Sequence, residues 1–179
     1  MDSATQILDI AERRMRETGY NAVSYRDIAS EMGIKSASLH YHFPKKEDLG
    51  AALTRRYADN FASALNQIAS QERNPKDRIK AFVEIYRFEL QQRGLVCLCA
   101  VLGAETAGLP DRVSLEIKNF FDENVNWLTQ QYKALNKDNP NKYAKTALSL
   151  LSGAMIVSAS SNDITIFDAA VESLSQELN

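Results

Sequence analysis

Residues 24–43 constrain the fold most, because they combine the signals of two short helices with a glycine between them. Ser24 can cap the first helix, and Asp27, three residues later, completes a capping-box pattern. Gly33 is expected to end that helix, since glycine enters the left-handed region without a steric penalty. A second helix of about two turns is predicted over 36–43. The stretch therefore predicts two helices joined by a tight turn.

The second helix presents a polar outer face. Leu39 and Phe43 are four residues apart and share one side, which is expected to pack inward. The side left outside carries Ser36, Ala37, His40 and Tyr41. Such a face makes a poor core and suits a DNA major groove. Lys45 and Lys46 begin the next helix, where a cation opposes the helix dipole and a DNA phosphate would relieve the conflict.

Charge is distributed unevenly along the 179 residues, although the formal net charge is only −2. Residues 33–56 hold five lysines and arginines against two acids, which favours contact with DNA at one end of the molecule. No apolar run approaches the roughly 20 residues that cross a bilayer. The N-terminus also lacks the layout of a signal peptide. A cytoplasmic protein without a membrane partner is expected.

The whole chain is predicted to be all-α. The four prolines fall between segments of helical apolar periodicity, and no Asn-Gly or Asp-Gly hairpin turn occurs. Further helices are predicted over 3–18, 46–71, 76–93, 95–107, 111–135, 141–160 and 163–178. The three helices before residue 50 form a head with too small a core to stand alone. The long fourth helix is expected to join this head, residues 1–50, to a body comprising 51–179.

The last two predicted helices carry more apolar surface than one small body can cover, which favours a homodimer through a four-helix bundle. The residues assigned to that interface are Leu148, Leu151, Met155, Phe167, Val171 and Leu174. The alternative is that both helices are simply core.

Several segments together resemble the signature of TetR-type transcriptional repressors: Arg26-Asp27-Ile28-Ala29, Gly33-Ile34 and Ser38-Leu39-His40-Tyr41-His42-Phe43, with Lys46 and Leu49. The resemblance covers about residues 5–50. It implies a helix-turn-helix repressor that binds a pseudo-palindromic double-stranded DNA operator as a homodimer. It further implies release by a small effector held in the C-terminal body. It also implies that Ser36, Ala37 and His40 reach base edges, that Ser38, Tyr41, His42 and Lys46 contact phosphates, and that Arg26 touches a base or a phosphate.

The chain departs from the family pattern at two positions of this motif. His40 stands where tyrosine is usual, and Lys35 stands where a capping serine or threonine is common. Ser36 is expected to take over the cap, and Lys35 to add a phosphate contact.

The body offers two alternative sensors. Aromatic side chains at helical spacing would suit an apolar or aromatic effector, and the same spacing fits a core. The candidate lining comprises Tyr57, Phe61, Phe82, Tyr86, Phe120, Phe121, Trp127 and Met155. Cys97 and Cys99 offer a thiol sensor of electrophiles or oxidants, as in some family members, with Arg93 close enough to lower the pKa of Cys97. The favoured alternative is that both cysteines are small buried hydrophobes.

Catalytic and metal sites are not predicted. His40 and His42 are accompanied by no cysteine or carboxylate set with metal-ligand spacing, and no nucleophile or paired carboxylate stands near them. We therefore expect neither an enzyme nor a cofactor. A helical adaptor that uses the two short helices for protein contacts stays open, but it would leave Lys45 and Lys46 without a role.

Overall fold

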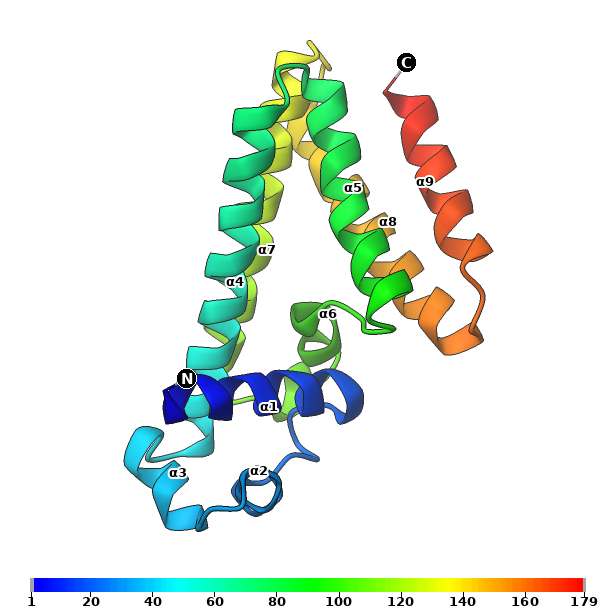
Figure 1. The fold of residues 1–179 in the computed structure, drawn as a ribbon. Coiled ribbons are helices and arrows are strands. Elements are labelled where there is room, and N and C mark those ends of the chain that lie inside the picture. The colour runs from blue at the N-terminus through cyan, green and yellow to red at the C-terminus, as the bar shows by residue number, and fades with distance from the viewer. Residues whose placement is uncertain (1, 179) are drawn as a thin grey trace. The chain divides into compact units, whose positions relative to one another are not determined.

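The computed structural model describes residues 2–178, and this part of the chain is helical without a strand (Figure 1). The predicted all-α fold is therefore confirmed. The elements are α1 (Ser3–Thr18), α2 (Tyr25–Met32), α3 (Ser36–His42), α4 (Lys46–Gln71), α5 (Pro75–Gln92), α6 (Leu98–Gly103), the 3₁₀ turn η1 (Thr106–Gly108), α7 (Asp111–Ala134), α8 (Pro140–Ser161) and α9 (Thr165–Glu177). None of the described helices is long and apolar enough to cross a membrane.

Local sequence signals set several helix ends. Ser24 and Asp27 form the predicted capping box at the start of α2, and Gly33 ends α2 with a left-handed φ of 67°. Asn74 and Asn139 cap α5 and α8, each followed by proline at the first helical position. The expected cap at Ser36 is wrong. Ser36 is the first residue of α3, and Lys35 occupies the cap position without a side-chain cap.

The chain divides into two compact units. The first runs to Asp59 and also contains Leu98–Phe120, while the second comprises Asn60–Cys97 and the chain from Phe121 onward. The first unit extends beyond the predicted head of residues 1–50, since α6 packs against α1. The N-terminal helices thus share their unit with a segment far along the sequence.

The core of the first unit combines these segments. Its fully buried side chains include Ile7, Met15, Ile28, Leu39, Leu49, Leu53 and Val113. Charges reinforce the packing at the surface, where Arg13 and Arg14 of α1 both pair with Glu31 of α2. Arg56 of α4 pairs with Asp9 and Glu12 of α1.

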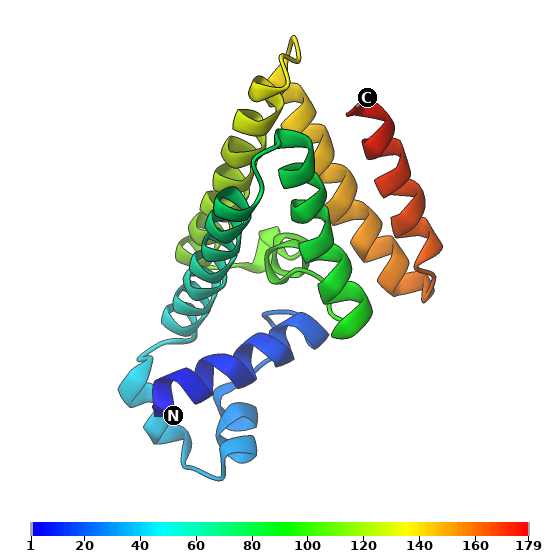
Figure 2. The ribbon, with the colours of Figure 1, turned by 45° about the horizontal axis from the view of Figure 1, so that its top comes forward.

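In the second unit, α8 lies along α9 and also contacts α5 (Figure 2). Ser158 near the end of α8 accepts a hydrogen bond from the Phe167 amide at 2.9 Å, which ties the start of α9 to α8. The residues predicted for a dimer interface lie mostly inside one chain. Five of these six residues, Leu148, Leu151, Met155, Phe167 and Leu174, are at most 5% exposed within one chain, and Val171 is half-buried. They form core because α8 and α9 turn these side chains into their own protomer.

Five of the eight residues predicted to line a ligand pocket are buried in the aromatic core, and Tyr57, Phe121 and Trp127 are half-buried. Phe82, Tyr86 and Met155 are at most 2% exposed. The ring centroid of Phe82 lies 5.7 Å from those of both Phe61 and Trp127. In the first unit, Tyr57 and Phe120 pack together with ring centroids 5.7 Å apart. These contacts are those of close-packed aromatic interiors.

Candidate nucleic-acid interface

Helix α3 is held by its apolar side and leaves its polar edge in solvent. Leu39 is fully buried, whereas Tyr41 is 86% exposed and His40 is also exposed. Ala37 and Ser38 are exposed beside them, and Ser36 and His42 are half-buried. An edge of one histidine, one tyrosine and small residues has both hydrogen-bonding groups and room for close approach to a duplex.

Tyr25 anchors the far end of α3. Its hydroxyl lies 2.7 Å from the carbonyl oxygen of Phe43 and 2.6 Å from that of Lys45, both of which can accept its hydrogen bond. Burial raises the pKa of Tyr25, so the hydroxyl keeps the proton that it donates. The Tyr25 ring also lies against His40, with centroids 4.7 Å apart, and Nδ1 of His40 is 3.1 Å from the carbonyl oxygen of Pro44. The orientation of α3 is therefore fixed by α2.

The start of α2 is an anionic cap. Asp27 accepts hydrogen bonds from the Ser24 hydroxyl at 2.5 Å and from the Ser24 amide at 3.1 Å. These bonds lower the pKa of Asp27, since they favour its charged form. The cap fixes the first turn of α2, which carries Tyr25 and through it contacts the end of α3.

The predicted cationic residues divide into two groups. Arg26, Lys35 and Lys45 are exposed, and Lys45 pairs with Glu47 at 3.2 Å. Lys46 is half-buried instead. Its ammonium donates to the carbonyl oxygen of Asn21 at 3.3 Å and lies 4.5 Å from the centroid of the Tyr20 ring. Burial lowers the pKa of Lys46. This lysine serves the loop between α1 and α2 in the structure, so the predicted phosphate contact would require its release.

Sequence reasoning missed three residues that build this interface. Tyr25 carries a recognisable signal, since it is an aromatic residue inside the two-helix motif. Asn21 and Glu105 carry none. The side-chain amide of Asn21 donates a hydrogen bond to the Glu105 carboxylate at 2.8 Å, and the two residues are 84 positions apart in the sequence. Only the folded chain brings them together.

The cysteines lie inside the protein. Cys97 is 2% exposed and Cys99 fully buried. The Cys97 amide donates to the sulfur of Met155 at 3.3 Å. Thiols so enclosed lack the access that reactive sensor cysteines require, which favours the interpretation of both as small core residues. Among the described residues, no group of three or more His, Cys, Asp or Glu side chains can hold a metal ion.

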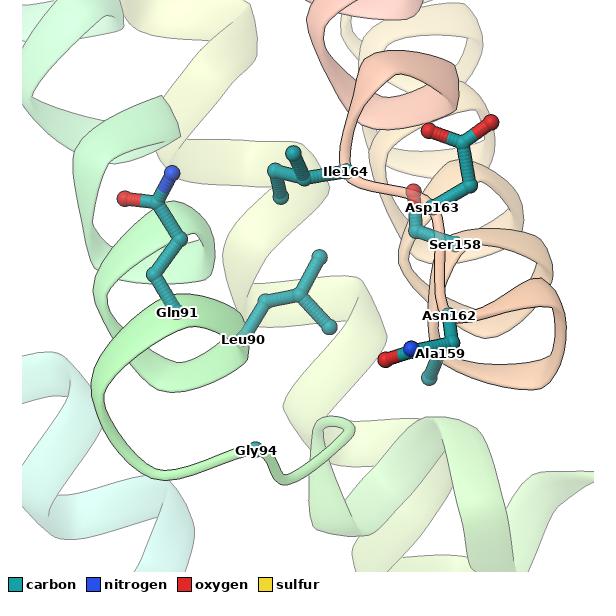
Figure 3. Close-up of a pocket in the computed structure, with 8 residues that line it drawn as sticks. All are labelled: Leu90, Gln91, Gly94, Ser158, Ala159, Asn162, Asp163 and Ile164. Atoms are coloured by element: carbon teal, nitrogen blue, oxygen red, sulfur yellow. The ribbon is translucent and has the colours of Figure 1, made fainter.

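The second unit carries surface clefts. One, of about 320 Å³, lies between the end of α5 and the turn from α8 to α9, where Leu90 and Ile164 point toward each other (Figure 3). A second cleft, of about 330 Å³, lies between α7 and α8, and most of the surface that it exposes is apolar. It is lined by Phe121, Val125, Lys145, Leu148, Ser149 and Ser152. Of the eight predicted ligand residues, Phe121 is the one that lines either of these two clefts.

Comparisons with known proteins give the family to which this sequence and fold are similar. Residues 7–53 match the family described as bacterial regulatory proteins, tetR family. The crystal structure of a TetR transcriptional regulator from Legionella pneumophila is 30% identical and superposes with a TM-score of 0.95, covering 100% of this chain and 98% of that one. A TetR-family regulator from Agrobacterium tumefaciens is 26% identical, with a TM-score of 0.92 over 97% of this chain and 96% of that one.

A curated relative matches over a shorter stretch. The HTH-type transcriptional repressor KstR2 of Rhodococcus jostii is 33% identical over 79 residues, which are 44% of this chain and 39% of that protein. The chain thus matches less than half the length of this relative. The helix-turn-helix match and the full-length structural similarity together show that the chain belongs to the TetR family of transcriptional regulators.

Proposed function

We propose that the protein is a cytoplasmic homodimeric repressor that inserts one α3 from each protomer into successive major grooves of a pseudo-palindromic operator. The observation that carries the proposal is the polar edge of α3, exposed on one side and anchored on the other by Leu39 and Tyr25. Two such helices spaced about 34–36 Å apart would fit one helical turn of DNA.

We assign DNA contacts to exposed or half-buried side chains of this region. His40, Ala37 and Ser36 face the base edges. Phosphates are contacted by Arg26, Lys35, Ser38, Tyr41, His42 and Lys45. With three exposed cations in each of two heads, about six phosphates are neutralised. The association constant should therefore fall steeply with salt, by about 0.9 logarithmic units per phosphate and per tenfold increase in salt concentration.

A binding titration tests this proposal. DNA from upstream of the protein's own gene is titrated by fluorescence anisotropy between 50 and 200 mM salt. Lys45→Gln should lower the salt slope by about 2, because each dimer carries two copies. The matched control, Lys80→Gln on the exposed surface of α5, should leave the slope unchanged. Affinity that does not respond to salt would refute the phosphate contacts, and absence of DNA binding would favour the adaptor interpretation.

The dimer contact is assigned to the outer face of α8. Ile156 and Val157 are 38% and 48% exposed, unlike the buried residues inward of them. Gly153, one turn earlier, has open space around its α-carbon. A small residue beside two exposed apolar ones permits a second helix to approach closely. Val157→Asp should shift the protein to a monomer in size-exclusion chromatography, and an unchanged elution volume would refute this interface.

Effector binding is assigned to the cleft between α7 and α8. Its mostly apolar lining, with Lys145 as its one cation, suits a small apolar or aromatic compound that carries at most one anionic group. A compound screen by thermal shift tests the assignment, because a ligand that binds the folded state raises the melting temperature. A hit from that screen should lose its effect in Phe121→Ala and should weaken operator binding by the wild-type protein. A hit that still stabilises Phe121→Ala fully would place the site elsewhere.

A further inference from the structure

Glu105 contacts the loop that leads into the helix-turn-helix. It lies between α6 and η1, and its carboxylate accepts three hydrogen bonds from two consecutive residues of the α1–α2 loop. The Tyr20 amide donates to Oε1 at 2.9 Å. The Asn21 amide and side chain donate to Oε2 at 3.1 and 2.8 Å. A carboxylate that accepts several N–H bonds holds its partners more strongly than a neutral acceptor does.

The loop is shaped around this carboxylate. Gly19 has a φ of +85°, and a Cβ atom at this position would stand 1.8 Å from Oε1 of Glu105. The next residue, Tyr20, is only 4% exposed, and a Cβ on Gly50 of α4 would stand 2.7 Å from its ring. Both glycines thus provide the close approach that the arrangement needs.

A cation closes the opposite side of the loop. The ammonium of Lys46 donates to the Asn21 carbonyl and lies over the Tyr20 ring. The negative charge of Glu105 favours the charged form of this lysine, against the cost of its burial. Glu105, the loop and the first residue of α4 therefore form one connected polar cluster.

The loop held by this cluster leads into the helix-turn-helix. The loop passes directly into the Ser24 cap of α2, and Tyr25 at the start of α2 holds the end of α3. We propose that Glu105 is a positioning residue for operator binding, which fixes the helix-turn-helix on the segment between α6 and α7. This inference rests on the proposed function, since it concerns how two heads reach one operator.

Simultaneous binding of two half-sites is the step that depends on this positioning. One head can bind a single half-site whatever its orientation relative to the other head. A full operator, by contrast, requires both α3 helices at a set spacing. Loss of the carboxylate should therefore weaken binding to the full operator and leave half-site binding unchanged. A residue that only stabilises the fold would weaken both in proportion to the unfolded fraction.

The test uses the full chain with Glu105→Gln, which retains the size of the side chain but loses its charge and one acceptor oxygen. We expect at least about tenfold weaker binding to the full operator, with half-site affinity within about twofold of wild type. Glu123→Gln, on the exposed surface of α7, is the matched control and should bind as wild type. Circular dichroism at the assay temperature reports the folded fraction.

Three results would overturn the inference. The first is wild-type affinity of folded Glu105→Gln for the full operator, and the second is an equal loss on both DNAs. Should Glu105→Gln not fold, Asn21→Ala carries the test, because it removes one of the three hydrogen bonds; its unchanged preference for the full operator would be the third. Failure of the wild-type protein to bind either DNA would instead overturn the proposed function, and this inference with it.

Discussion

Two tyrosines in the helix-turn-helix allow stability and DNA binding to be separated by the same chemical change. Tyr25→Phe removes a hydroxyl that lies 2.7 and 2.6 Å from two backbone carbonyls at the end of α3. Tyr41→Phe removes a hydroxyl from a side chain that is 86% exposed. Each variant keeps its aromatic ring, so the packing against His40 in the first case is retained.

The magnitudes follow from the surroundings of the two hydroxyl groups. One proton serves both carbonyls near Tyr25, so about one net hydrogen bond is lost, and the partly buried carbonyl of Phe43 is left without its donor. Together these cost about 1–2 kcal/mol in the free energy of unfolding. In a chain of this length that lowers the melting temperature by about 2–8 °C. The Tyr41 hydroxyl is exposed, so its removal should change stability by no more than about 0.5 kcal/mol.

The two variants should differ in DNA affinity, which only Tyr41→Phe is expected to lower. Tyr41→Phe is expected to lower operator affinity by about five- to 150-fold, because each of the two protomers loses one phosphate hydrogen bond worth about 0.5–1.5 kcal/mol. Tyr25→Phe should bind nearly as wild type well below its melting temperature. Thermal unfolding by circular dichroism and anisotropy titrations on the same preparations measure both quantities. A wild-type melting temperature for Tyr25→Phe, combined with a lowered one for Tyr41→Phe, would refute the assignment of the two roles.

Three further outcomes are expected. Leu39→Ala should lower the free energy of unfolding by about 2–5 kcal/mol in urea titrations, because the side chain is fully buried; a smaller loss would show that α3 is not held by this residue. The pKa of Asp27 is lowered in the folded state, so its cap stabilises the fold above the unfolded pKa of about 3.9 and is lost as the pH falls through the folded value. Asp27→Asn should therefore be less stable than wild type at pH 7, with the difference shrinking below about pH 4; a constant difference across that range would contradict this. Cys97 and Cys99 should react with a thiol reagent only in denaturant, and rapid labelling of the native protein would revive the thiol-sensor hypothesis.

The sequence determined the helix-turn-helix because its determinants are local. The capping box joins Ser24 to a residue three positions later, and Gly33 ends α2 through its own backbone conformation. The inward side of α3 also follows from helical spacing, which places Leu39 in the core and leaves Tyr41 outside. Signals of this kind act over a few residues, so they can be read before any tertiary contact is known.

Only the tertiary structure decided which partners the apolar and polar faces find. Helical periodicity identified α8 and α9 as apolar, but it could not say that Met155 and Phe167 face their own protomer while Val157 stays exposed. Nor could it predict that Glu105 meets the loop at Asn21, or that Lys46 turns toward the same loop. An amphipathic pattern gives the direction of a face along its own helix and carries no information about which distant segment covers it.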